Sequence, residues 1–486
     1  VMLFVCLGLM VSKYGSIRLG EDDSRPECSN FSWFSMLFSA GVGIGILFFG
    51  VAEPLFYFDN SGAFGYPNNP HADLDGATAM NMDRAVHAMR VTYFHWGFHG
   101  WAIYVMVGLC LAYFAFRKKL PLTMRSALYP VIGNKIYGPV GHGVDLLAVF
   151  GTVFGVATSL GLGVTQMAVG LNVLFGIDPG ITTQIILIAI ISVIATFSAV
   201  SGVGNGIRII SEWNIWLSVL LLAFFLFAGP TKWLLGYFIT SIGDYLWHVI
   251  PMGFWTANTA ENIAWQGGWT IFYWGWWVSW APFVGMFIAR ISRGRTIREF
   301  MVGVLFVPTA IAFFWLCMFG GNAIYMELNA ADGVGTAGIV DLVRAWNLPQ
   351  ALYGTIEQLT TISALQWGMS ALATFLLATW FITSSDSGTL VITTMLSMGD
   401  DAPPQRFRII WGLGEGFVAA VLLLAGGLRA LQTASIAAAL PISLIMMFMA
   451  YGILKSLRED PSAVAAPPDP KAVAPDGTSM AGELRA

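Results

Sequence analysis

Long runs of apolar residues, separated by short polar or charged segments, repeat along almost the whole chain. A run of about 20 such residues is long enough to cross the hydrocarbon core of a bilayer as a helix. The pattern therefore predicts an all-α membrane protein with a core at residues 31–453. Its ten predicted transmembrane helices lie near residues 32–58, 91–116, 143–171, 183–202, 213–229, 270–290, 300–320, 366–397, 407–427 and 432–453.

Residues 232–250 have a different pattern, because their apolar side chains recur at helical spacing but alternate with polar ones. This is typical of an amphipathic helix that lies along a membrane surface. Residues 345–362 are likewise too interrupted to span a membrane. The apolar positions of the predicted surface helix are Leu234, Leu235, Phe238, Ile239, Ile242, Tyr245, Leu246 and Ile250.

The composition agrees with a membrane protein, since 56% of the 486 residues are hydrophobic and only 11% are charged. Soluble domains carry about 25% charged residues, so this chain has too little polar surface to cover a soluble globule. A net charge of −4 gives no reason to expect a nucleic-acid partner. The expected surroundings are membrane lipid, in the plasma (inner) membrane of a bacterial-type cell.

The two ends of the chain differ from the core. Residues 1–12 are apolar but too short to span, so we interpret residues 1–30 as the end of a truncated transmembrane helix followed by a cytoplasmic loop. Residues 454–486 are rich in Ala and Pro. That composition predicts a disordered cytoplasmic tail.

Lysine and arginine residues indicate the orientation of the helices. If residues 13–30 are cytoplasmic, the loops on that side hold 17 basic residues and the opposite loops hold 5. Such an excess is typical of cytoplasmic loops. The segments assigned to the cytoplasm are 13–30, 117–136, 203–212, 290–299, 398–408 and the start of the tail.

The first predicted span contains three glycines, Gly41, Gly43 and Gly45. Each costs a helix about 0.8–1 kcal/mol relative to alanine. Their lack of side chains lets a substrate approach or lets backbone carbonyls turn toward an ion. The alternative is tight helix packing, since Gly41 and Gly45 are four residues apart.

The eighth predicted span contains a polar run, residues 383–387, with four hydroxyls and the carboxylate of Asp386. Hydroxyl oxygens suit a hard cation such as Na⁺. The alternative is a helix whose hydroxyls bond to its own backbone, and Asp386 is either a structural or a proton-linked group. Because interrupted helices in an internally repeated bundle mark the site of many transporters, both segments are candidates for a midplane site.

Four tryptophans crowd into residues 274–280, more than anchoring at a membrane interface explains. A second aromatic set consists of Trp96, Trp101 and Tyr104. Together the two sets can form a cage for a quaternary ammonium ion, which has no N–H groups to donate. Cation–π attraction then replaces hydrogen bonds, at about 0.5–2 kcal/mol per ring. The sequence therefore predicts an organic methylated cation, such as glycine betaine, as the substrate.

Other isolated polar residues give weaker signals. Glu53 precedes Pro54 and is expected to bond backbone groups that the proline frees, while His95 and His99 are expected to be packing residues. Glu415 has no evident partner in the sequence. No nucleophile–base pair, zinc motif or phosphate-binding loop is present, so we expect neither an enzyme nor an ATP-driven pump, and no cofactor.

At these positions the chain resembles the betaine/carnitine/choline transporter (BCCT) family. The Trp-rich stretch that runs into the Arg-rich stretch is the most specific of the similar segments, and the resemblance extends to about residue 455. The similar segments are residues 37–45, 52–55, 95–104, 272–295 and 383–387.

The resemblance implies a bundle of two inverted five-helix repeats, like that of sodium-coupled neurotransmitter symporters, with the N-terminal helices truncated. It implies an aromatic box at the midplane and a passage to the cytoplasm lined by Trp276 and Trp280. The implied box consists of Trp96, Trp101, Tyr104 and Trp277, next to Gly41, Gly43 and Gly45.

The resemblance also implies a sodium site made of backbone carbonyls and hydroxyls. Its ligands would come from Ser39, Val42, Trp380, Thr383 and Ser384. A second sodium site in the family uses two threonines one turn apart. Thr152 fits the first position, but Val156 occupies the second, so the number of coupled ions stays open.

The function that these features imply is Na⁺-coupled symport of glycine betaine or a related compatible solute. Choline, proline betaine and dimethylsulfoniopropionate share the methylated cation, so the sequence does not choose among them. The alternative is a sodium-independent or proton-coupled carriage of carnitine or choline, although Gly45, where proton-coupled relatives carry an acidic residue, favours sodium. The resemblance further implies a homotrimer formed through the surface helix.

Overall fold

The computed structural model describes residues 1–41, 43–63, 68–201, 204–400 and 403–461. Over these residues the chain folds into helices without a strand, and a single isolated β-bridge joins Arg18 to Thr296. The predicted all-α class is therefore confirmed.

The helices of the first half, including short 3₁₀ and π turns marked η, are α1 (Met2–Val11), η1 (Lys13–Ser16), α2 (Asn30–Gly41), α3 (Gly43–Phe58), α4 (Pro70–Leu74), α5 (Met82–Trp96), α6 (Phe98–Ala112), η2 (Tyr113–Arg117), η3 (Met124–Leu128), α7 (Tyr129–Ile132), η4 (Gly133–Tyr137), α8 (Pro139–Phe175), α9 (Ile181–Ser201) and α10 (Gly204–Ala228). Those of the second half are α11 (Thr231–Phe254), α12 (Ala260–Gln266), η5 (Gly267–Ile271), α13 (Phe272–Arg290), α14 (Ile297–Leu328), α15 (Ile339–Arg344), α16 (Leu348–Leu359), α17 (Ser363–Leu396) and α18 (Gln405–Arg458).

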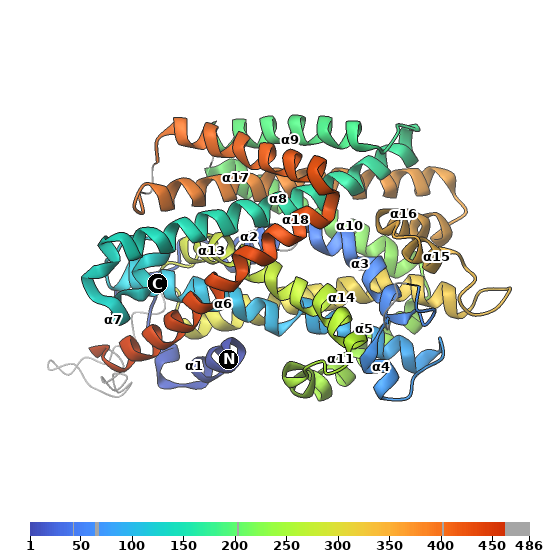
Figure 1. Cartoon of the computed structure of the whole chain (residues 1–486), viewed down its shortest axis with the longest axis horizontal. Coiled ribbons are helices and arrows are strands. Elements are labelled where there is room, and N and C mark those ends of the chain that lie inside the picture. The colour runs from blue at the N-terminus through green and yellow to red at the C-terminus, as the bar shows by residue number, and fades with distance from the viewer. Residues whose placement is uncertain (42, 64–67, 202–203, 401–402, 462–486) are drawn as a thin grey trace, which may run out of the picture.

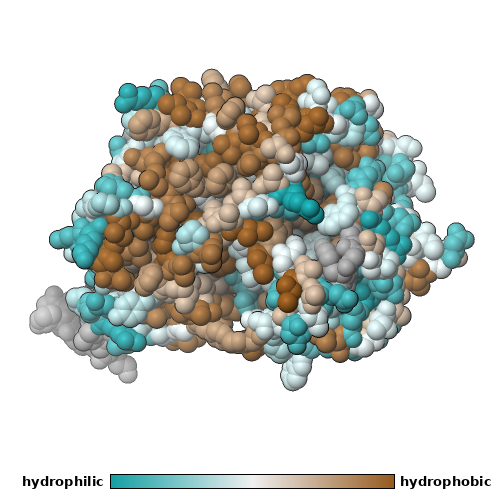
Figure 2. Space-filling model, viewed as in Figure 1, coloured by the Kyte–Doolittle hydropathy of each residue, from teal (hydrophilic) through white to brown (hydrophobic). Residues whose placement is uncertain are grey.

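The long helices lie side by side along the longest axis of the molecule (Figure 1). Helix α8 packs against α17 and α18, α13 packs against α6, and α14 packs against α3. Hydrophilic residues gather at the two ends of this bundle, whereas much of the visible surface between them is apolar (Figure 2). An apolar belt between two polar ends is what a bilayer requires of a protein that spans it.

The described residues of each of the ten predicted spans lie mostly in helical segments of the structure. By length and apolar composition, six helical stretches of the described residues can cross a membrane, or seven if the bent pair α10–α11 counts as one. Helix α3 is apolar but short, and Val42, between α2 and α3, lies outside the described residues. The predicted ninth and tenth spans join in α18, which is bent at Gly426 and Gly427, where the backbone leaves helical geometry.

Helix α11 corresponds to the predicted surface helix and is bent by 108° from α10. Its apolar residues divide between two sides. Leu234 and Tyr245 are buried against the bundle, whereas Ile239 and Leu246 are 71% and 52% exposed. Such a helix both packs on the protein and presents apolar side chains outward, as an interfacial helix does.

The segments predicted to be cytoplasmic meet at one end of the bundle. Arg117 donates to the carbonyl of Gly20 at 3.1 Å and pairs with the carboxylate of Asp460 at 2.8 Å. Arg18 donates to the carbonyl of Gly294 at 2.8 Å. These contacts join the loop after α1, the segment after α6, the α13–α14 turn and the end of α18. The alternation of sides that the loop charges predicted therefore agrees with the structure.

The segments predicted to lie outside meet at the opposite end. Arg344 of α15 pairs with Asp59, next to the end of α3, at 2.7 Å, and Arg90 of α5 pairs with Asp244 of α11 at 2.5 Å. Burial of Asp59 disfavours its charged form, but hydrogen bonds from Arg344 and Ser61 outweigh that effect and lower its pKa. The paired carboxylate thus fixes the outer loops to the core.

Two expectations need correction. The polar run at residues 383–387 does not interrupt its helix, because α17 is continuous from Ser363 to Leu396. Thr383 explains this, since its hydroxyl donates to the carbonyls of Thr379 and Trp380 and is satisfied inside the helix. The tail also begins later than residue 454, because α18 extends to Arg458, and residues 462–486 lie outside the described part.

Replacing the buried Arg84 by methionine is expected to destabilise the outer end. Its guanidinium donates to the carbonyls of Phe58, Asp59 and Ala77 at 2.7–2.9 Å and pairs with Asp73. Leaving these groups unpaired should cost about 3–5 kcal/mol. Thermal unfolding in detergent measures the effect as a lowered midpoint. The control is Arg293→Met, which removes a half-exposed ion pair with Glu27. An equal decrease of the unfolding midpoint in both variants would contradict the stabilising role of Arg84.

Candidate functional site

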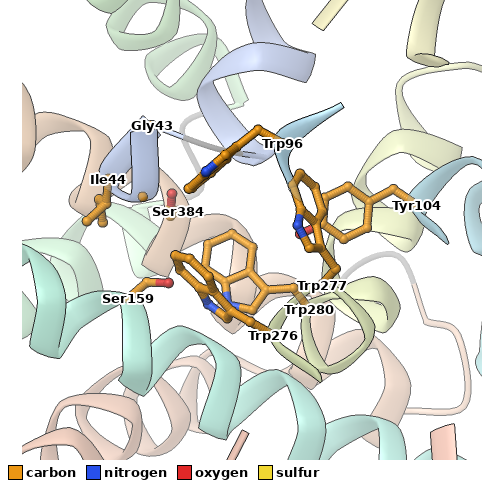
Figure 3. A pocket seen from close by; sticks show the side chains of 10 residues that line it. Gly43, Ile44, Trp96, Tyr104, Ser159, Trp276, Trp277, Trp280 and Ser384 are labelled. Atoms are coloured by element: carbon orange, nitrogen blue, oxygen red, sulfur yellow. The ribbon is translucent and has the colours of Figure 1, made fainter. Parts of the chain in front are cut away.

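A small cavity lies in the middle of the bundle, where α3, α5, α6, α8, α13 and α17 meet. Its walls combine indole and phenol rings with hydroxyls and glycine backbone. Figure 3 shows Trp96, Tyr104 and Trp277 on one side and the hydroxyls of Ser159 and Ser384 on the other. The lining residues are Gly43, Ile44, Gly45, Trp96, Tyr104, Ser159, Trp276, Trp277, Trp280 and Ser384.

Three of the four residues predicted for the aromatic box face this cavity, and the fourth supports them. The ring of Trp277 lies 4.8 Å from that of Tyr104 and 6.1 Å from that of Trp96, centroid to centroid. Trp101 does not line the cavity but packs edge-on against Tyr104 and Trp277, at 5.7 and 5.8 Å. The predicted passage residues Trp276 and Trp280 also line the cavity.

Glycines allow these large rings to lie against the helices. A methyl group at Gly45 would come within 2.7 Å of both Trp96 and Trp276, and one at Gly100 would come within 2.5 Å of Trp277. Two carbon atoms do not approach this closely, so these positions have to be glycine for the rings to adopt this packing. Gly43 meets Trp380 in the same way, at 2.5 Å.

Three polar atoms of residues that line the cavity have no hydrogen-bond partner within the described part of the protein. They are the indole N–H groups of Trp276 and Trp280 and the hydroxyl of Ser159. Buried polar atoms are almost always paired, so these groups stand out among the lining residues. The cavity thus combines an aromatic side with a side that carries hydroxyls.

Of the residues predicted to bind sodium, the structure places one, Ser384, at the cavity. Ser384 lines the cavity, and Thr383 donates to the carbonyl of Trp380 at 2.9 Å. Ser39 and Gly41 belong to α2, whereas Val42 lies outside the described residues. The hydroxyl of Thr152 is bonded to the carbonyl of Ala148 within α8, at 2.8 Å.

Glu53 has a larger part in this site than its sequence context indicated. The buried carboxylate accepts hydrogen bonds from the side chains of Tyr57, His95, Trp96 and Tyr273. His95 also positions Trp277, because its backbone carbonyl accepts from that indole at 3.0 Å. The only sequence signal for this cluster was a carboxylate within an apolar span, which is costly unless it serves a function.

The rest of the polar run on α17 points away from the cavity. Ser385 donates to Glu415 of α18 at 2.9 Å, and Asp386 accepts from Ser198 of α9 at 2.6 Å. Glu415 therefore has the partner that the sequence did not reveal. These contacts tie α17 to α9 and α18 on the face opposite to the cavity.

Comparison with known proteins places the chain among membrane transporters. The family described as "BCCT, betaine/carnitine/choline family transporter" matches residues 1–462. A probable glycine betaine transporter of Desulfitobacterium hafniense is 43% identical over 463 residues, which is 95% of this chain and 88% of that protein. The glycine betaine transporter OpuD of Bacillus subtilis is 44% identical over 465 residues, 95% of this chain and 86% of that protein.

A relative with a broader name is the glycine betaine/proline/choline/ectoine transporter of Vibrio parahaemolyticus. It is 41% identical over 464 residues, covering 95% of this chain and 79% of that protein. These bacterial relatives fit a place in the inner membrane, and their names describe transporters rather than enzymes. With its apolar helical bundle and a match over almost its whole length, this integral membrane protein belongs to the betaine/carnitine/choline transporter family.

Proposed function

We propose that this protein is a secondary active transporter that carries glycine betaine, or a related methylated ammonium or sulfonium solute, together with Na⁺. The observation that carries this proposal is the central cavity, where the rings of Trp96, Tyr104 and Trp277 lie opposite the hydroxyls of Ser159 and Ser384. The relatives named as glycine betaine transporters support it. Choline is a second substrate candidate, because it occurs in the name of a relative.

The two sides of the cavity suit the two ends of a zwitterion. A methylated ammonium has no N–H to donate, so aromatic rings attract it through their negative faces, at about 0.5–2 kcal/mol per ring. A carboxylate at the other end accepts hydrogen bonds, and the indoles of Trp276 and Trp280 with the hydroxyl of Ser159 supply unpaired donors. Glycine betaine has both groups, whereas choline has only a hydroxyl at its second end.

Sodium is proposed to bind where α17 meets the α2–α3 segment. The oxygens of Thr383, Ser384 and the Trp380 carbonyl are hard ligands of the kind that such a cation prefers. Carbonyls of Ser39 and Val42 would complete this set. An ion held there would join the two segments and thereby stabilise the substrate cavity between them. A second ion near Thr152 is not proposed, since Val156 offers no oxygen beside it.

The architecture that goes with this function is ten transmembrane helices in two inverted repeats of five. The first repeat would run from α2 to α10 and the second from α13 to α18. The Arg-rich end of the bundle is proposed to be cytoplasmic, with Trp276 and Trp280 on the passage toward it. The exposed apolar side of α11 is proposed to form contacts in a homotrimer.

Energy for accumulation would come from Na⁺ entry, which supplies about 2.3 kcal/mol per charge for each 100 mV of membrane potential. Alternating exposure of the cavity to the two ends of the bundle would couple the ion to the solute.

With the protein reconstituted into liposomes, labelled glycine betaine should accumulate when an inward Na⁺ gradient is applied and not when K⁺ replaces Na⁺. Uptake that does not depend on the Na⁺ gradient but does depend on a proton gradient would instead support proton-coupled transport. Uptake that requires a solute inside the liposomes would support sodium-independent exchange.

Removing one proposed ion ligand should lower the affinity for sodium while the protein still folds. Ser384→Ala is expected to raise the Na⁺ concentration for half-maximal uptake by about tenfold or more, since loss of ordinary metal-site contacts has effects of that size. Thr379→Ala, a change on the same helix at a hydroxyl bonded only to backbone, should leave it unchanged. An unaltered Na⁺ requirement in Ser384→Ala would contradict the proposed site.

Removing one ring should weaken binding of the solute. Trp277→Leu is expected to cost about 1–2 kcal/mol, equivalent to roughly 5–30-fold in Kd. Equilibrium binding of labelled glycine betaine to the purified protein measures the loss. The control is Trp213→Leu, because Trp213 is 65% exposed on α10. If both variants bind as the native protein does, the aromatic cage is assigned wrongly.

A further inference from the structure

We propose that Glu53 determines the specificity of the cavity for cations: its carboxylate aligns the cage rings and supplies the negative charge behind them. The inference rests on the proposed binding of a methylated cation. It adds that Glu53 makes the cavity bind a charged ligand more tightly than an uncharged ligand of the same shape.

The hydrogen bonds around Glu53 suit an ionised carboxylate. One oxygen accepts from the hydroxyl of Tyr57 at 3.1 Å and from the ring of His95 at 2.9 Å. The other accepts from the indole of Trp96 at 2.6 Å and from the hydroxyl of Tyr273. A carboxylate has about four acceptor positions, and here four donors fill them.

The surroundings do not neutralise this charge. An uncharged imidazole satisfies both contacts of His95, because Nδ1–H donates to Glu53 and Nε2 accepts from the hydroxyl of Thr270 at 3.0 Å. Among the described residues, His95 is the only titratable base within ion-pair distance of Glu53. With His95 in this uncharged form, the cluster carries one net negative charge in a fully buried place. A buried charge of this kind is costly and is retained where it has a function.

The cluster is connected to the cavity through the cage rings. Trp96 lines the cavity and at the same time donates its N–H to Glu53. Tyr273 stacks on His95 at 4.6 Å with an angle of 12° between the rings, and the indole of Trp277 is fixed by the backbone of His95. The hydrogen bond from Trp96 to an anion also increases the electron density of its ring, which strengthens its attraction for a cation.

The charge acts differently on ligands of different net charge. Choline carries one positive charge and is attracted as a whole, at a strength of about tenfold or more in Kd for a buried charge one ring away. In glycine betaine the attraction of the ammonium is opposed by repulsion of the carboxylate. Glu53 should therefore matter more for choline than for glycine betaine.

The test compares the Kd of choline and of glycine betaine in purified native and variant proteins. Glu53→Gln keeps the size of the side chain and removes the charge, so the Kd of choline should rise by about tenfold more than that of glycine betaine. Glu53→Asp keeps the charge but withdraws the carboxylate, so both ligands should bind more weakly in the native ratio. The matched control is Glu327→Gln, which removes another buried carboxylate, one that accepts backbone N–H groups after α14, and should change neither Kd.

Each outcome decides one part of the proposal. A folded Glu53→Gln protein with the native ratio of the two Kd values overturns the charge role, and Glu53→Asp with native affinities overturns the positioning role. If Glu53→Gln does not fold, the native protein is tested with 3,3-dimethyl-1-butanol, the uncharged carbon analogue of choline, and equal binding of the two overturns the charge role. Native protein that binds neither choline nor glycine betaine contradicts the proposed function itself.

Discussion

Polar groups buried between apolar helices have to be satisfied by the protein itself, because the core of a membrane offers no water. This constraint organises the structure at every level. At the outer end, Arg84 donates hydrogen bonds to backbone carbonyls that no helix satisfies. On α17, Thr383 bonds back to its own helix. In the middle, Glu53 gathers four side-chain donors, and the ring geometry of the cavity follows from that cluster.

The same constraint explains which cavity groups can bind a ligand. The indoles of Trp96 and Trp277 have partners within the protein, so only their ring faces are free to act. The indoles of Trp276 and Trp280 have none within the described residues. The tryptophans around the cavity therefore differ in whether their N–H group already has a partner within the protein.

Helix α17 links the cavity to the outside of the bundle because its polar residues point in different directions. Ser384 faces the cavity, Ser385 contacts Glu415 on α18, and Asp386 contacts Ser198 on α9. Successive residues of a helix diverge by about 100°, so three neighbouring side chains reach three different helices. A displacement of α17 would therefore affect the cavity and both outer helices together.

The sequence by itself determined the positions of the helices, the grouping of the loops at two ends and the aromatic residues of the cavity. These follow from hydropathy, loop charge and residue type, which are local properties. Only the tertiary structure decided that Trp101 stands behind the cage, that α17 is unbroken, and that Glu53 and His95 hold Trp96, Tyr273 and Trp277. The contacts of Glu53 join residues as far apart as 220 positions, and local patterns do not specify which distant donors will surround a buried carboxylate.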